Sequence, residues 1–317
     1  MCVNLIWGDK MSDIARRRPQ RTFSTWLNSN NVAGYLFISP WLIGFITLSL
    51  IPVIVSLYMA FTNYNLISAP QFIGFKNFER MLSDSRLVKS VKATLFYVLI
   101  SVPLKVGFAL LIAFLLNHKM KAANLFRSAY YLPTLVGGGI PVALMWKQMF
   151  ANDGVINGIL QKLGIDGVYW LGSKSTAIWV IILLTVWQFG SSMLTFSAGL
   201  KQIPETYYEA ARLDGASSGK LFIHITIPSL SSIIFFNLIM QIISAFTAFN
   251  QAYVITNGKP LDSTLLYALY VYKKAMDNFD MGYACALSWV LMIVIALITL
   301  LIFRTSTKWV YYESKEV

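Results

Sequence analysis

The chain of 317 residues is 56% hydrophobic and 13% charged, has a mean hydropathy of +0.60 and carries a net charge of +12. An average soluble domain carries about 25% charged residues, so this composition excludes an ordinary soluble domain and favours a multi-pass membrane protein whose helices, each of about 20 apolar residues, cross the bilayer. The basic residues lie at the ends of apolar segments instead of forming one stripe with interleaved aromatic residues, which argues against a nucleic-acid partner.

Residues 1–31 are predicted to form a cytoplasmic tail, because basic residues next to a span tend to stay on the cytoplasmic side of the membrane. No apolar stretch with a small-residue cleavage site precedes the first span, so we expect no cleavable signal peptide and leave the start between Met1 and Met11. The basic residues that carry this prediction are Arg16, Arg17, Arg18 and Arg21.

The first transmembrane helix is predicted over 32–61, with Pro40 near its start and Pro52 as a kink. An external connection is expected over 62–93. Within this connection, a short helix at the membrane interface is predicted from the amphipathic spacing of three apolar residues. These residues are Phe78, Met81 and Leu82.

A core domain with five further transmembrane helices is predicted over 94–304, followed by a second cytoplasmic tail over 305–317. The helices are expected over 94–116, 130–150, 176–200, 229–254 and 282–303. Arg304 and Lys308 follow the last helix and favour a cytoplasmic C-terminus. The fold class predicted from these patterns is an all-α integral membrane protein with six transmembrane helices and both ends in the cytoplasm.

Lys105 is a charged residue inside the second predicted span. A charge at that depth costs about 2.5 to 3.5 kcal/mol on insertion scales, so its side chain should face protein or water instead of lipid. Two interpretations remain open. Lys105 either lines a cargo pathway or contacts a carbonyl or another polar neighbour inside the helix bundle.

The sequence gives no sign of a catalytic, metal or nucleotide site. Its two cysteines and two histidines have no metal-ligand spacing. The run from Gly167 to Gly172 is followed by Ser173 and then Lys174, one residue out of register with a phosphate-binding loop. The isolated residues are Cys2, Cys285, His118 and His224.

The polar segment 201–228 separates two apolar spans. Pro204 at the first helical position and Glu205 in the first turn favour a helix start, and Gly215 can end that helix in the left-handed conformation. Ser217 or Ser218 is expected to cap a second short helix that ends before Pro228. The segment is therefore predicted to be a helix, a turn and a helix on the cytoplasmic face of the membrane.

This segment resembles the EAA motif of permease subunits of bacterial ATP-binding-cassette importers. The matching residues are Glu209, Ala210, Ala211, Asp214, Gly215, Ala216, Ile225 and Pro228. Other stretches are most similar to the carbohydrate-uptake permeases: Ser39-Pro40-Trp41, Phe61-Thr62-Asn63-Tyr64, Tyr131-Leu132-Pro133 and Thr256-Asn257-Gly258-Lys259-Pro260. One departure is Lys259, where relatives often carry a second glycine.

The resemblance implies a type I importer permease (MetI-like) bundle in the bacterial cytoplasmic (inner) membrane. It implies that the EAA segment is a coupling helix, in which Glu209 meets a basic residue of an ATPase subunit and Gly215 makes the bend. The implied partners are a second homologous permease, two ATP-binding-cassette ATPase subunits, an extracytoplasmic solute-binding protein, the sugar and membrane lipid. ATP and Mg²⁺ would bind the ATPase subunits, and this chain would hold no cofactor and catalyse no reaction.

A possible cargo pathway follows one face of the fifth span. Amide and hydroxyl side chains recur there at helical spacing and could pair with sugar hydroxyls, although hydrogen bonding between helices explains the same pattern equally well. These residues are Asn237, Gln241 and Ser244, with Thr247 and Gln251 nearby. The resemblance also leaves open whether this permease or its partner contacts the sugar.

The main prediction is a permease of a sugar importer, and the alternatives differ in cargo or energy source. A permease of the same class for glycerol-3-phosphate would look alike in sequence. A secondary transporter would usually show several charged residues deep in its spans, and here only Lys105 qualifies. A membrane enzyme would need converging His, Asp, Glu or Cys residues, which the sequence does not indicate.

Overall fold

Residues 30–117 and 123–311 are described by the computed structural model of the protein, and their regular secondary structure is helical. Within these ranges the extended pairing is limited to one isolated bridge between Thr62 and Phe72. The chain divides into two units, Met1–Tyr58 and Met59–Val317. The predicted tail 1–31 therefore lies almost wholly outside the described residues, as do His118 and the end of the C-terminal tail.

The described part of the first unit is an apolar helical run from α3, Asn30–Phe45, through the π turn η1, Ile46–Leu50, into α4, Ile51–Ala60, whose last two residues belong to the second unit. Pro40 was expected near a helix start but lies inside α3. Its missing N–H leaves the Leu36 carbonyl without its usual helical donor, and Ser39 Oγ donates to that carbonyl at 2.8 Å instead. A neighbouring hydroxyl thus allows the helix to continue past the proline.

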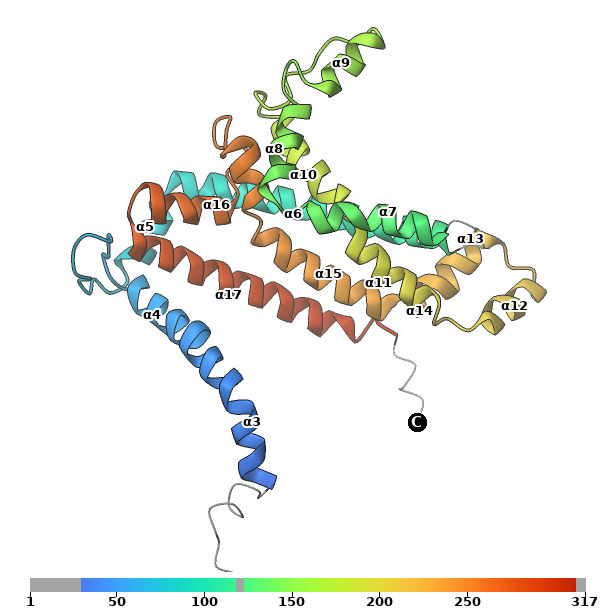
Figure 1. Ribbon diagram of the computed structural model, residues 1–317, viewed down its shortest axis with the longest axis horizontal. Helices are drawn as coiled ribbons and strands as arrows, with labels where there is room; N and C mark the ends of the chain where they lie inside the picture. The colour runs from blue at the N-terminus through green and yellow to red at the C-terminus, as the bar shows by residue number, and fades with distance from the viewer. Residues whose placement is uncertain (1–29, 118–122, 312–317) are drawn as a thin grey trace, which may run out of the picture. The chain divides into compact units, whose positions relative to one another are not determined.

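The second unit is built around α6, Ser85–Leu116, which packs against α10, α11 and α15. Small residues of α6 such as Ala109 and Ala113 are fully buried and permit this close packing. Figure 1 shows α5 and α12 at opposite ends of this unit. Its other helical segments are α5 Lys76–Ser83, α7 Ala123–Val136, α8 Ile140–Met149, α9 Val155–Lys162, α10 Ala177–Trp187, α11 Gly190–Leu200, α12 Glu205–Leu213, α13 Ser218–Leu221, η2 Phe222–Thr226, α14 Ile227–Ser229, α15 Ser231–Phe246, η3 Ala252–Thr256, α16 Tyr267–Tyr272, η4 Lys273–Asp277 and α17 Met281–Ser306.

Two of the predicted continuous helices are broken. The range 130–150 divides into α7 and α8 at the glycines that follow Val136, and the range 176–200 divides into α10 and α11 with a bend of 41°. The two breaks meet, because Gln188 Nε2 donates to the Gly137 carbonyl oxygen at 2.6 Å. A carbonyl that leaves helical hydrogen bonding inside an apolar bundle is thereby satisfied.

Three helical runs of the described residues are long and apolar enough to cross a membrane, and the number reaches five if each of two bent pairs is one span. The unbroken runs are Gly34–Ala60, Ser85–Leu116 and Met281–Ser306. α6 begins at Ser85, earlier than the expected span start near residue 94, and α15 ends at Phe246, before the expected end at residue 254. Met281–Ser306 agrees closely with the last predicted span.

Residues 60–64 are fixed to α5 and α17 by hydrogen bonds that their main-chain carbonyls accept. The side chain of Asn77, which is 4% exposed, donates to the carbonyls of Ala60 and Thr62 at 2.9 and 2.8 Å. The Gly282 N–H donates to the Tyr64 carbonyl at 2.9 Å. The predicted short helix is thus present as α5, but Asn77, and not the 89% exposed Leu82, provides its anchor to the core.

Candidate functional site

The segment between α11 and α15 exposes a short helix, α12, that no other part of the described chain buries. Glu209, Ala210 and Asp214 are exposed, whereas Ala211 and Ala216 are half-buried. The helix is nevertheless fixed, because the hydroxyls of Tyr208 and Thr226 lie 3.0 Å apart and join it to η2. α12 is therefore a positioned helix with a free surface.

Gly215 ends α12 as the sequence indicated. Its φ of +79° is the left-handed conformation that glycine adopts without steric cost. The Gly215 N–H donates to the Arg212 carbonyl at 3.0 Å, and the Ala216 N–H donates to the Ala211 carbonyl at 2.9 Å. This pair of bonds is a Schellman motif, which satisfies two carbonyls at the helix end and turns the chain sharply.

The flanks of this segment differ in detail from the prediction. Pro204 precedes the first helical residue instead of occupying it, and the Ser217 side chain makes no capping hydrogen bond. Pro228 does not follow the second helix but lies inside its last turn, after the π turn η2. The chain then bends by 67° into α15, which begins at Ser231.

A polar cavity of about 290 Å³ lies between α6, α10, α11 and α15. Three of the four predicted pathway residues, Lys105, Gln241 and Ser244, line it together. Asn237 does not, because it is 4% exposed and its amide donates to the Ile233 carbonyl of its own helix at 3.0 Å. The polar residues of the wall are Tyr97, Ser101, Lys105, Thr185, Gln188, Ser191, Gln241, Ser244 and Gln251.

Several of these wall residues were not predicted from the sequence. Tyr97 and Ser101 precede Lys105 by eight and four positions, so the three share one face of α6. The same spacing that drew attention to α15 could have identified them. Thr185, Gln188 and Ser191 are harder to find, because they surround a break that the hydropathy pattern does not reveal.

A second, larger groove of about 630 Å³ lies between α15 and α17 and includes Thr247. Its wall is mostly apolar, and the hydroxyls of Thr247 and Ser288 donate to carbonyls of their own helices at 2.9 Å. Such a surface offers few hydrogen bonds to a polar solute. The smaller polar cavity is therefore the better candidate for a hydrophilic cargo, despite its size.

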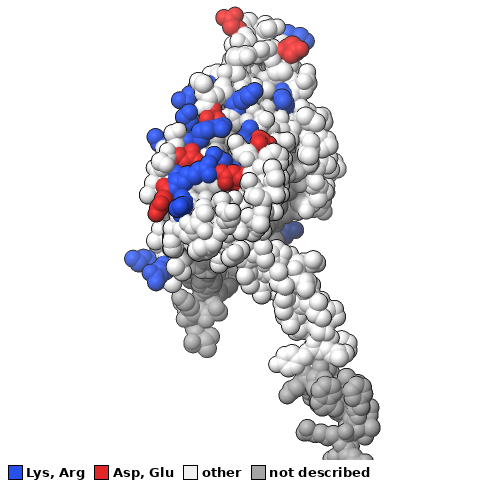
Figure 2. Space-filling view, turned by 90° about the vertical axis from the view of Figure 1, so that its left-hand side faces the viewer, with Lys and Arg blue, Asp and Glu red and all other residues white. Residues whose placement is uncertain are grey.

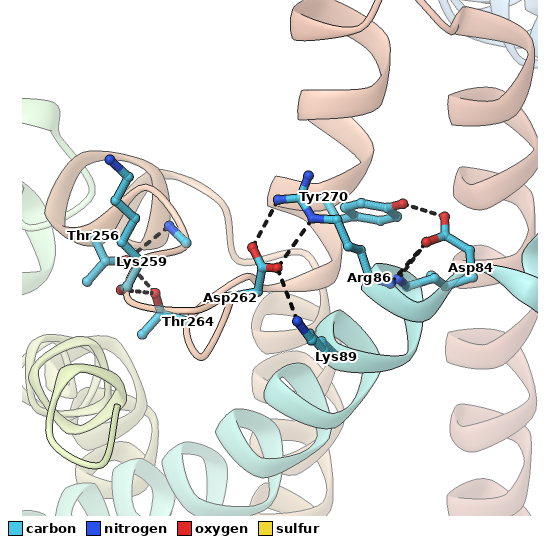
Figure 3. A network of polar contacts seen from close by, with 10 residues as sticks. Asp84, Arg86, Lys89, Thr256, Lys259, Asp262, Thr264 and Tyr270 are labelled. Atoms are coloured by element: carbon cyan, nitrogen blue, oxygen red, sulfur yellow. Dashed lines mark hydrogen bonds and ion pairs between the residues drawn. The ribbon is translucent and has the colours of Figure 1, made fainter. Parts of the chain in front are cut away.

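Charged side chains gather at the end of the second unit opposite α12, as Figure 2 shows. Arg86 forms an ion pair with Asp262 at 2.9 Å, and Lys89 approaches the same carboxylate at 3.7 Å (Figure 3). The hydrogen bond from Arg86 and its positive charge hold the pKa of Asp262 below its usual value, although burial opposes the shift. These contacts attach the 257–264 loop to the start of α6.

The same loop contains the departure from the family pattern at Lys259. Asn257 and Gly258 adopt positive φ angles of 52° and 84°, whereas Lys259 is not among the positive-φ residues of the described chain. The Thr264 hydroxyl donates to the Lys259 carbonyl at 2.9 Å (Figure 3). The turn therefore forms without a glycine at position 259.

Asp84 connects three helices at this end. Its carboxylate accepts from the backbone N–H groups of Arg86 and Leu87 at the start of α6, and from the hydroxyls of Tyr270 in α16 and Tyr283 in α17. Burial raises the pKa of Asp84, but these hydrogen bonds and the charge of Lys274 lower it more, so the pKa lies below its ordinary value.

We expect Asp84→Asn to destabilise the protein at neutral pH by about 1 to 3 kcal/mol, because hydrogen bonds to a charged acceptor are lost. A lowered carboxyl pKa contributes stability above the unfolded pKa, near about 4, and this contribution disappears as the pH falls through the folded pKa. The gap in unfolding temperature between the variant and the parent should therefore be largest at neutral pH and should narrow in acid. Thermal unfolding in detergent from neutral to acidic pH measures it, and a gap independent of pH would contradict the assignment.

Among the described residues, no group of three or more His, Cys, Asp or Glu side chains is close enough to hold a metal ion. His224 is exposed, and its Nδ1 lies 3.1 Å from the Lys220 carbonyl oxygen. Cys285 is half-buried and forms no disulfide with any residue that the structure describes.

The matching family and the similar proteins are all membrane components of transport systems. The model of a family described as "Binding-protein-dependent transport system inner membrane component" matches residues 72–311. The "Probable ABC transporter permease protein YesP" of Bacillus subtilis is 51% identical over 294 residues, which cover 92% of this chain and 95% of that protein. The "Arabinooligosaccharides transport system permease protein AraP" of Bacillus subtilis is 32% identical over 284 residues, covering 88% and 90%.

A solved structure shares the fold. It is the crystal structure of a bacterial alginate ABC transporter in complex with an alginate pentasaccharide-bound periplasmic protein. One of its chains superposes with a TM-score of 0.74 at 22% sequence identity, covering 86% of this chain and 93% of that chain.

Proposed function

Because the chain belongs to the family of binding-protein-dependent transport system inner membrane components, we propose that it is the transmembrane permease subunit of an ATP-driven carbohydrate importer. One observation carries the coupling part of this proposal: α12 is fixed to its own chain by Tyr208 but keeps its surface free for another protein. The resemblance to importer permeases is confirmed by the family match and by the permease relatives.

We propose that α12 docks in a groove of an ATPase subunit. The small side chains of Ala210 and Ala211 would allow close approach, and the exposed carboxylate of Glu209 would meet a basic residue there. Leu213 is 90% exposed and adds an apolar contact. The Schellman turn at Gly215 and the bond between Tyr208 and Thr226 would transmit displacement of α12 to the 218–229 helix and then to α15.

The proposed cargo is a sugar or oligosaccharide. The relative named for arabinooligosaccharides supports this class, and the polar cavity of this chain offers amide and hydroxyl groups that suit sugar hydroxyls. Lys105, Gln241 and Ser244 would lie along the pathway. Asn237 lies one turn before Gln241 in α15, and its side chain would bond to its own helix instead of contacting cargo.

We propose that the complete bundle has six transmembrane helices in the bacterial inner membrane, with both chain ends and α12 in the cytoplasm. Helix length and hydropathy identify up to five spans, and α7 and α8 together would form the sixth. A second permease would complete the cavity, two ATPase subunits would hold ATP and Mg²⁺, and a solute-binding protein would deliver cargo to the opposite face.

The mechanism we propose is alternating access. ATP binding would bring the two ATPase subunits together and draw the coupling helices with them, which opens the cavity toward the binding protein. Hydrolysis would reverse this movement. This chain contributes positioning and a pathway, and the chemical step takes place on the partner subunits.

Glu209→Lys is expected to lower ATP-driven uptake at least about tenfold, because loss of a paired interfacial carboxylate and its replacement by a like charge oppose docking. Uptake of labelled sugar by proteoliposomes containing the whole transporter measures this. Asp166→Lys makes the same charge change at an exposed site distant in sequence from α12 and should leave uptake unchanged. Unaltered uptake in Glu209→Lys would refute the coupling assignment.

The same proteoliposomes distinguish the alternative functions. Glycerol-3-phosphate uptake in place of sugar uptake would change the cargo but keep the class. Uptake driven by a proton gradient without any ATPase subunit would overturn the importer assignment in favour of a secondary transporter.

A further inference from the structure

Lys105 is the one charged residue among the described residues that line the polar cavity. It lies in α6 one helical turn after Ser101, and amide and hydroxyl side chains of α11 and α15 form the facing wall. Within residues 30–117 and 123–311, no Asp or Glu contributes to this wall. The cavity therefore combines a positive charge with neutral hydrogen-bonding groups.

The charge of Lys105 is not neutralised by the described part of this chain. The ion pairs found in residues 30–117 and 123–311 all involve Asp262 or Asp280, at the end where α6 begins. Lys105 Nζ makes no hydrogen bond or ion pair with a described residue. A lysine held at this depth of a spanning helix is costly unless an anion or water accompanies it.

A second basic site lies nearer the start of α6. Lys89, Lys92 and Lys174 line a groove of about 460 Å³ in which Asp262 is the acidic residue. Asp262 is already paired with Arg86 at 2.9 Å and with Lys89 at 3.7 Å, which leaves Lys92 and Lys174 as the lysines of the groove without a carboxylate partner among the described residues. The groove and the cavity thus both favour anions over cations, and they are lined by the same helix.

We propose that the transported carbohydrate carries an anionic group, a carboxylate or a phosphate, and that Lys105 binds this group as the cargo passes through the cavity. Ser244, Gln251 and the amide oxygen of Gln241 would pair with its hydroxyls, since Gln241 Nε2 already donates to Ser192 Oγ at 3.2 Å. This inference rests on the proposed importer function and narrows its cargo. The chemistry that it requires is a polyol with a negative charge, which uronate-containing sugars and sugar phosphates both provide.

The test is equilibrium binding of labelled probes to the whole transporter in nanodiscs. The first pair of probes is a glucuronate-containing disaccharide and its carboxyl-reduced neutral counterpart, and the second pair is glycerol-3-phosphate and glycerol. We expect the charged member of at least one pair to bind about tenfold more tightly than its neutral counterpart. The preference should be lost in Lys105→Gln and retained in Lys105→Arg.

Each outcome decides a separate point. A preference confined to the disaccharide pair identifies a carboxylate, and one confined to the glycerol pair identifies a phosphate. Equal affinities within both pairs, absence of binding, or a preference that persists in Lys105→Gln would overturn the inference. Lys162→Gln, which removes a lysine from the end of α9, is the control and should behave as the parent protein.

Uptake by proteoliposomes separates this inference from the proposed function. ATP-driven uptake of a neutral sugar that Lys105→Gln leaves unchanged would refute the anionic cargo while the importer function stands. If the parent transporter imports no carbohydrate when ATP is supplied, the proposed function itself fails. Size-exclusion profiles of the variant complexes establish that each one assembles.

Discussion

Gly282→Ala is expected to lower the stability of the protein by about 3 kcal/mol, the upper part of the usual range for overpacking. A Cβ atom on Gly282 would lie 2.1 Å from the Thr62 carbonyl oxygen and 3.1 Å from the Tyr64 nitrogen. Both are main-chain atoms of a segment that Asn77 also holds, so they cannot rotate away as a side chain can. Helix propensity alone would favour alanine by about 1 kcal/mol, and the clash should reverse that sign.

The measurement is the midpoint of thermal unfolding in detergent, with Gly107→Ala as the control. Gly107 also lies in a long apolar helix, but nothing lies within 4 Å of its added Cβ. The control should therefore be neutral or slightly stabilised. Equal midpoints for the two variants would show that the contact between α17 and residues 62–64 is unimportant for stability.

Gly190→Ala is expected to produce the second large loss, of about 2 to 3 kcal/mol, because it would separate α11 from α7. Its Cβ would lie 2.7 Å from the Tyr130 carbonyl oxygen and 2.8 Å from Tyr131 Cα. Moving α7 away would also strain the hydrogen bond from Gln188 to Gly137. Both stability and uptake should fall.

Gly199→Ala is the matched control on the same helix. Its Cβ would meet Ile233 Cδ1 at 2.1 Å and Leu230 Cδ2 at 2.9 Å, which are ends of flexible side chains. These can adopt other rotamers, so the unfolding midpoint should fall less than in Gly190→Ala. A larger fall in the control would mean that side-chain packing, and not the approach of two backbones, determines the stability of α11.

A helix could be predicted from the sequence where it is one long apolar run between polar segments. α17 is a long apolar run between polar segments, and hydropathy located it closely. The break before Gly190 was not predictable, because residues 176–200 read as one apolar segment without a proline. Conversely, Pro103 lies inside α6, which continues past it. Whether a helix breaks depends on whether a neighbouring group donates a hydrogen bond to the freed carbonyl, and the pattern within a single helix carries no such information.

Part of the candidate site was predictable from the sequence and part was not. The turn at Gly215 was predictable because glycine adopts that conformation without steric cost and the motif is local in sequence. The cavity was only partly predictable, since its walls come from helices far apart in the chain. Asn237 shows the limit: it has the same spacing as Gln241, but its side chain bonds within its own helix. Helical spacing shows that residues share one face of a helix, but it does not show which other helix or cavity that face contacts.

The hydrogen bond between Gln188 and Gly137 has a mechanical consequence. Gln188 is both the donor that satisfies the broken helix beside it and part of the wall of the polar cavity. If α10 and α11 straightened, the Gly137 carbonyl would lose its donor and the cavity would lose part of its wall at the same moment. The two breaks are thus joined by the same side chain that lines the cavity, so straightening of these helices and a change in the cavity wall are coupled through Gln188.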